Sequence, residues 1–156
     1  MQTAGVKPDA ITYNSMIDAC ARAEPAQGKK AVEMLSQMVA AGLRPNVKSY
    51  SAAVTACSRG GQWQQALQLK HQAISAGIQL DVIIWNAVID ACAKAEPAQW
   101  RPALGLLQEM QEAGISPTVQ SYTAAMDVCA KAEPAQLQTA LDLLREMQAA
   151  GISPTV

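Results

Sequence analysis

Two kinds of chemically capable side chain recur at a near-constant spacing along this chain. The first kind is a thiol, which can bind a metal or form a disulfide, and it occurs at Cys20, Cys57, Cys92 and Cys129. The second is a cation two residues further on, and it occurs at Arg22, Arg59, Lys94 and Lys131. A row of cations suits a polyanion, because each one can neutralise a phosphate.

The spacing of the cysteines argues against both a disulfide and a metal site. Successive cysteines are 37, 35 and 37 residues apart. If they occupy equivalent positions of stacked helical units, neighbouring thiols lie roughly 8–10 Å apart. That separation exceeds the reach of a disulfide and disperses the ligands too widely for a four-ligand metal site. We therefore expect buried free thiols, no metal and no cofactor, with a reducing compartment as the weaker inference.

The elements that position these residues repeat with the same period. Residues 10–46, 47–81, 82–118 and 119–155 align as four tandem units, and residues 1–9 match the end of a further unit. A period in the mid-thirties is typical of a solenoid of stacked supersecondary units. We expect one repeat array over residues 1–156, either as a segment of a longer array or as a truncated gene product.

Each unit carries two apolar stripes at helical spacing. In the first unit, Tyr13, Met16, Ile17 and Cys20 follow the pattern i, i+3, i+4, i+7, and residues 31–38 repeat it. This pattern predicts one buried face on each of two α-helices. A glycine ends the second stripe of every unit, as is common at helix C-termini. The sequence therefore predicts an all-α fold.

Two local features qualify this expectation. We expect the hydroxyl residues Thr12, Ser49 and Ser121 to be the N-caps of the first helices, whereas Ile84 cannot cap. The second unit breaks the apolar stripe of its second helix with Lys70 and Ala73. We expect looser packing there.

Composition limits the functional classes. The formal net charge is −1, which is not the usual balance of a nucleic-acid-binding protein. No run of 18 apolar residues predicts a membrane span, and no secretory or transit segment opens the chain. The sequence contains no glycine-rich phosphate loop, nucleophile–base pair or metal-binding cluster. We therefore expect no enzyme, no small-molecule substrate and no membrane partner.

The residue pattern resembles one solenoid family. The segment Ile11–Cys20 resembles the opening of a pentatricopeptide repeat, and residues 31–46 resemble its close. Residues 82–90 and 103–117 match as well. The resemblance implies a right-handed superhelical α-solenoid of helix-turn-helix repeats. It also implies binding of single-stranded RNA, one base per repeat.

The resemblance assigns roles to particular positions. In this family the fifth and last residues of a repeat read one base together, which gives the pairs Asn14 with Asn46, Ser51 with Asp81, Asn86 with Thr118, and Thr123 with Thr155. The second residue packs beside the base, and these residues are Ile11, Lys48, Ile83 and Gln120. By the same analogy, the first pair suggests cytosine and the second suggests guanine.

The four cations allow two interpretations. They share one face of the first helix with the fifth and ninth residues of each unit. In that position Arg22, Arg59, Lys94 and Lys131 can follow an RNA backbone. Alternatively, three of them form i, i+4 ion pairs with Asp18, Asp90 and Asp127, worth about 0.2–0.5 kcal/mol each.

Two functions therefore remain open. The first is an RNA-binding module that acts in RNA processing, stability or translation in the mitochondrion or chloroplast, as the resemblance implies. The second is a protein-binding α-solenoid scaffold. The sequence pI of about 5.8 and three Glu-Pro turns favour the scaffold somewhat.

Overall fold

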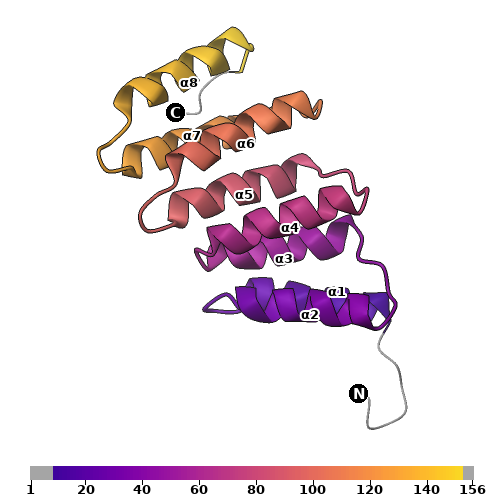
Figure 1. Cartoon of the computed structure of the whole chain (residues 1–156). Helices are drawn as coiled ribbons and strands as arrows, with labels where there is room; N and C mark the ends of the chain where they lie inside the picture. The colour runs from indigo at the N-terminus through magenta and orange to yellow at the C-terminus, as the bar shows by residue number, and fades with distance from the viewer. Residues whose placement is uncertain (1–8, 153–156) are drawn as a thin grey trace.

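The computed structural model describes residues 9–152, which fold into eight α-helices without a strand in that range. Each unit contributes one antiparallel helix pair, and the pairs stack in chain order (Figure 1). The helices are α1 (Ala10–Arg22), α2 (Gly28–Ala40), α3 (Val47–Arg59), α4 (Trp63–Ser75), α5 (Val82–Lys94), α6 (Trp100–Glu112), α7 (Val119–Lys131) and α8 (Leu137–Ala149). The predicted all-α array of helix-turn-helix units is confirmed.

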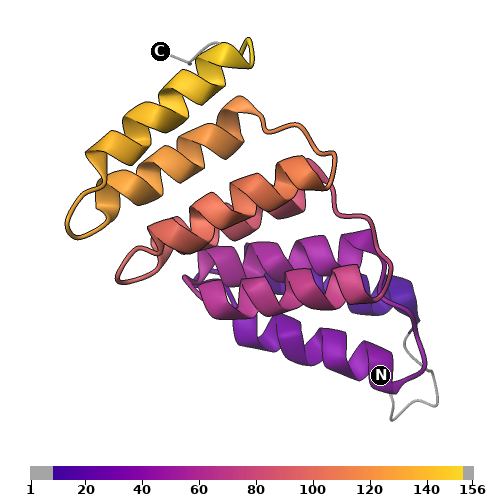
Figure 2. The ribbon, with the colours of Figure 1, turned by 45° about the horizontal axis from the view of Figure 1, so that its top comes forward.

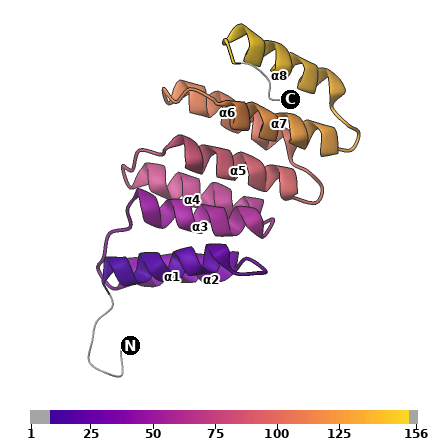
Figure 3. The same ribbon diagram turned by 180° about the vertical axis from the view of Figure 1, so that it is seen from behind.

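The odd-numbered helices form a continuous layer. α1 packs on α3, α3 on α5 and α5 on α7, whereas the backbone of each even-numbered helix lies close only to odd-numbered helices. Figure 3 shows the stack from behind, and Figure 2 shows that successive pairs rotate relative to one another. Successive odd-numbered helices lie closer together than successive even-numbered helices. The odd layer is therefore the inner side of the right-handed superhelical solenoid.

The core follows the two apolar stripes. One aromatic residue per unit lies at the fourth position of the odd helix, and all four are between 2% and 6% exposed: Tyr13, Tyr50, Trp85 and Tyr122. On the even helices, Met38, Met110 and Met147 are at most 1% exposed. Burial of these side chains provides most of the driving force for stacking. The predicted apolar faces are confirmed except at two residues of the first unit, because Met16 is 45% exposed and Cys20 is half-buried.

The N-caps of the odd helices differ from the prediction. The capping side chains belong to Asp9, Asn46, Asp81 and Thr118, each of which accepts the backbone N–H of the residue three positions later. Ser49 and Ser121 occupy that third position, where their hydroxyls complete capping boxes. Ile84 fits the same position because only its backbone N–H is needed there. The last residue of one unit therefore starts the helix of the next.

The expectation of looser packing in the second unit is wrong. Lys70 on α4 is 1% exposed, and Ala73 is fully buried. The Lys70 Nζ atom lies 2.5 Å from the Glu109 Oε2 atom on α6 and 5.4 Å from the ring centroid of Trp85 on α5. A buried ammonium is tolerated only with such partners. Lys70 therefore joins the second unit to the third.

Three turns between paired helices, at residues 23–27, 95–99 and 132–136, are longer than the fourth and contain an internal hydrogen bond. In each of the three, the glutamine side chain donates to the proline carbonyl two residues earlier, at 2.8–3.0 Å, as in Gln27 to Pro25. The glycines at the even-helix ends have φ between 78° and 82°, the left-handed region expected of a C-terminal stop. No helix within residues 9–152 is long and apolar enough to span a membrane.

Candidate nucleic-acid interface

A groove of about 750 Å³ lies between α1 and α3 and reaches the start of α5. Its lining includes eight of the predicted site residues, namely Ile11, Asn14, Arg22, Lys48, Ser51, Arg59, Asp81 and Ile83. These residues come from three units, and stacking of the odd helices brings them together. Apart from Ile83, the groove does not extend to the predicted residues of units 82–118 and 119–155.

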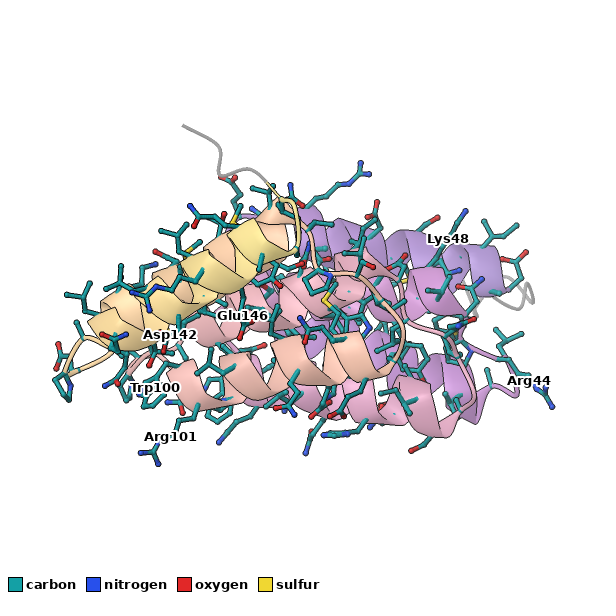
Figure 4. All side chains as sticks on the ribbon, turned by 90° about the horizontal axis from the view of Figure 1, so that it is seen from above. Arg44, Lys48, Trp100, Arg101, Asp142 and Glu146 are labelled. Atoms are coloured by element: carbon teal, nitrogen blue, oxygen red, sulfur yellow. The ribbon has the colours of Figure 1, made fainter. Side chains whose placement is uncertain are left out.

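Exposed apolar side chains border this groove. Ile11 is 75% exposed and Ile83 is 61% exposed, although both are large aliphatic residues. Lys48 occupies the same position of the unit between them and is also exposed. Figure 4 shows Lys48 on the odd-helix side of the stack, opposite Trp100 and Arg101. The fourth residue of this set, Gln120, is exposed but does not line the groove.

The first predicted base-reading pair, Asn14 with Asn46, is joined by a serine from the next unit. Ser49 is fully buried, and its Oγ atom donates to Asn14 Oδ1 at 2.5 Å. The same Oγ atom accepts the backbone N–H of Asn46 at 3.1 Å. Asn46 Oδ1 in turn accepts the backbone N–H of Ser49 at 3.1 Å. The pair is therefore held by a side-chain network that also caps α3.

The third pair repeats this arrangement. Ser121 is fully buried and donates its hydroxyl to Asn86 Oδ1, while its Oγ atom accepts the backbone N–H of Thr118 at 3.0 Å. Asn86 Nδ2 lies 3.5 Å from Thr118 Oγ1. Sequence reasoning interpreted both serines as helix caps and missed these contacts. Their recurrence at the third position of two units was the only available signal.

The second pair lacks this bridge. Ser51 and Asp81 both line the groove, but the third residue of the next unit is Ile84, which has no hydroxyl. Asp81 Oδ1 accepts the Ile84 backbone N–H at 3.0 Å. Thr123 is exposed, and its predicted partner Thr155 lies outside the described residues.

Each of the four predicted phosphate-binding cations has a carboxylate partner. Three form the i, i+4 pairs expected from the sequence, with N–O distances of 2.9–3.1 Å: Arg22 with Asp18, Lys94 with Asp90 and Lys131 with Asp127. Arg59 instead reaches the preceding unit, where it lies 3.7 Å from Glu24 and donates to the Ala21 carbonyl. Contact with phosphate stays a prediction.

The cations also do not share one depression. Arg22 and Arg59 line the groove, whereas Lys94 and Lys131 line a second depression of about 610 Å³ together with Glu96 and Glu133. Carboxylates from the longer turns therefore border the second depression. The column of cations expected from the sequence is divided into two parts.

Sequence comparison decides the family. Residues 48–156 match the model described as "Pentacotripeptide-repeat region of PRORP". Residues 1–61 match the model described as "Pentatricopeptide repeat domain". The chain belongs to the pentatricopeptide repeat family. No curated protein sequence matches it significantly.

Solved structures show the same pentatricopeptide repeat solenoid. PPR10 in complex with an 18-nucleotide psaJ RNA element superposes with a TM-score of 0.76 at 22% identity, over 99% of this chain and 22% of that chain. PPR10 from maize gives 0.75 at 27% identity, over 99% and 21%. The pentatricopeptide repeat domain of Arabidopsis thaliana PRORP1, in complex with tRNA, gives 0.81 at 14% identity, over 99% and 78%. The chain thus spans less than a quarter of PPR10.

The cysteines of this pentatricopeptide repeat chain are free thiols. Cys57, Cys92 and Cys129 are fully buried, whereas Cys20 is half-buried. Burial raises the pKa of the Cys57 and Cys92 thiols to about 11. No cluster of three or more metal-ligating side chains occurs in the part of the chain that the structure describes.

Alkylation should therefore discriminate among these thiols. At pH 8 we expect iodoacetamide to modify Cys20 first, because the thiolate is the nucleophile and the other sites are enclosed and protonated. Cys57 and Cys92 should react at a comparable rate only after unfolding in denaturant. Peptide mass spectrometry over a time course measures the order. Equal native reactivity of Cys20 and Cys57 would contradict the burial described above.

Proposed function

We propose that the odd-helix side of this chain binds single-stranded RNA, one base per unit. The observation that carries the proposal is the groove between α1 and α3, in which polar base-reading residues lie beside the exposed side chains of Ile11 and Ile83. Such a surface suits a nucleobase, which has an apolar face and a polar edge. PPR10 and PRORP1, which share the fold, were solved in complex with RNA and tRNA.

The charges of the groove agree with this ligand. Its lining includes the cations Arg22, Lys48 and Arg59 against the carboxylates Asp18 and Asp81. The local balance is therefore positive although the whole chain has a formal charge of −1. Lys48 forms none of the ion pairs found within residues 9–152, so its charge is available for a phosphate.

Base identity follows from the polar pairs. We assign cytosine to Asn14 with Asn46, and guanine to Ser51 with Asp81, by family analogy. The carboxylate of Asp81 accepts hydrogen bonds only, and guanine presents two adjacent donors on its Watson–Crick edge. Binding, with no catalysis, is the role proposed for this chain. A role in RNA processing, stability or translation in the mitochondrion or chloroplast is part of the same proposal and rests on family membership.

Salt dependence tests the proposal. We expect the chain to bind short single-stranded RNA, with log K falling as log salt rises at a slope near −0.7 per phosphate contacted. Four units contact few nucleotides, so we expect weak binding. NMR titration is suitable because it measures weak affinities. Poly-glutamate of matched charge is the control polyanion. RNA binding that is insensitive to salt, or equal binding of RNA and poly-glutamate, would contradict a base-reading groove.

The second candidate is a protein-binding scaffold. The observation in its favour is that every predicted phosphate-binding cation has a carboxylate partner, which reduces its attraction for phosphate. Exposed glutamates, Glu24, Glu96 and Glu133, also lie at the longer turns, where they add negative charge beside the cations. Failure of the titration to detect any RNA binding would favour this function.

A further inference from the structure

We infer that the buried hydroxyl at the third position of a unit fixes the polarity of the base-reading asparagine in the unit before it. The hydroxyls are those of Ser49, which faces Asn14, and Ser121, which faces Asn86. The inference rests on the proposed function, because it concerns how the same groove selects a base. It adds a positioning residue to the second, fifth and last positions given by the family resemblance.

The single proton of Ser49 determines the orientation of Asn14. The Ser49 Oγ atom accepts the backbone N–H of Asn46, and two acceptors lie within reach of its one proton: Asn14 Oδ1 at 2.5 Å and Asn46 Oδ1 at 3.1 Å. The shorter contact, with Asn14, is the one that requires the proton. The contact of 2.5 Å with the Asn14 amide is in the range of O–H···O bonds and is too short for N–H···O. The Asn14 oxygen therefore faces Ser49, and its amino group faces the groove.

Asn46 is oriented by the same serine. Its Oδ1 atom accepts the Ser49 backbone N–H at 3.1 Å, which leaves the Asn46 amino group for a ligand. The unit 10–46 thus presents two amino groups, each of which donates hydrogen bonds only. Cytosine is the RNA base with two adjacent acceptors, N3 and O2, on its Watson–Crick edge. Hydrogen-bond polarity therefore gives a physical reason for cytosine that does not depend on family analogy.

Ser121 extends the rule to a unit for which the resemblance gives no base. Its hydroxyl accepts the Thr118 backbone N–H and donates to Asn86 Oδ1, so the Asn86 amino group points away from Ser121. The unit 82–118 therefore presents a hydrogen-bond donor, which pairs with an acceptor atom of the base. Among the three units whose base-reading pairs the structure describes, unit 47–81 is the exception, because Ile84 offers no hydroxyl.

The test compares three variants: two at Ser49 and one control at Ser58. Ser49→Ala removes the hydroxyl but keeps the cap of α3, because Asn46 accepts the backbone N–H of residue 49. Ser49→Thr restores a hydroxyl at the same place. Ser58→Ala is the matched control, because Ser58 is 3% exposed on the same helix and its hydroxyl donates to Asp90 instead.

In the RNA-free chain, we expect Ser49→Ala to lower the NMR order parameter of the Asn14 side-chain amide, and we expect Ser49→Thr and Ser58→Ala to leave it unchanged. With RNAs that differ at one base, Ser49→Ala should reduce the preference of unit 10–46 for cytosine over uracil by about tenfold. The base preference of unit 47–81 should not change.

The outcomes separate the two proposals. An Asn14 amide that stays equally ordered in Ser49→Ala, or an equal loss of order in Ser58→Ala, overturns the inference. If the unmodified chain binds RNA and Ser49→Ala keeps its preference for cytosine, the inference is wrong while the proposed function stands. If the unmodified chain binds none of the RNAs, the proposed function itself is wrong.

Discussion

Replacing Glu109 with alanine is expected to lower the free energy of unfolding by roughly 2–3 kcal/mol, and the melting temperature by about 5–10 °C. The substitution leaves the Lys70 ammonium, which is 1% exposed, without its carboxylate partner. Loss of one partner of a buried ion pair is costly, because the remaining charge stays desolvated. The expected loss is below the roughly 3–5 kcal/mol typical of a fully buried pair, because the Glu109 side chain is 49% exposed and water can approach the ammonium.

Lys70→Leu is the informative companion variant. The other three units have leucine at this position, namely Leu35, Leu107 and Leu144. An apolar side chain in place of a buried charge needs no ionic partner, and such replacements are often neutral or stabilising. We therefore expect the free energy of unfolding to stay unchanged or to rise by about 1 kcal/mol. Glu112→Ala, on the exposed side of α6, is the control and should change stability by less than about 0.5 kcal/mol.

Thermal and urea unfolding followed by circular dichroism measure these differences. A loss for Glu109→Ala no larger than that for Glu112→Ala would show that the Lys70 charge is solvated in solution. If Lys70→Leu instead lowers the free energy of unfolding by several kcal/mol, the ion pair contributes net stability. Either result would change the interpretation of how the second and third units are joined.

Changing Asp81 to asparagine is expected to reduce the preference of unit 47–81 for guanine by roughly 10–100-fold, which corresponds to about 1–3 kcal/mol. Asp81 Oδ1 is engaged by the Ile84 backbone N–H, so Oδ2 is the atom left for a base. In asparagine an amino group takes that place and meets the N1–H donor of guanine directly. Helix α5 should be unaffected, because aspartate and asparagine are equally good N-caps.

The reciprocal variant and a charge control make the test specific. Asn46→Asp should weaken the preference of unit 10–46 for cytosine and leave the base preference of unit 47–81 unchanged. Asp127→Asn removes the same charge from α7 outside the groove, where Asp127 pairs with Lys131, and should leave all base preferences as they are. Titration of each variant with RNAs that differ at one base is the measurement. Equal changes at every base would contradict the assignment of one base to one unit.

Much of the fold was predictable because its signals are local in the sequence. Helical periodicity places Tyr13 and Ile17 on one face, and a glycine ends each even helix. The i, i+4 pair of Asp18 with Arg22 follows from helix geometry alone. The near-identical spacing of the cysteines likewise sufficed to predict that they are free rather than paired.

The contacts between units were not predictable in this way. The bond from Ser49 to Asn14 joins residues 35 positions apart, and the pair of Lys70 with Glu109 joins residues 39 apart. Arg59 leaves its own helix to reach the turn at Glu24. Each contact depends on the rise and twist between neighbouring units, which no local pattern specifies.

The sequence alone thus determined the period, the helices and which positions face inward, because hydrophobic patterning within one unit is enough to define an amphipathic helix pair. Only the tertiary structure decided which side chains meet across units, including the buried lysine, the divided column of cations and the serines that contact Asn14 and Asn86. The physical reason is that a polar contact requires matched distance and direction, and stacking of the units fixes both.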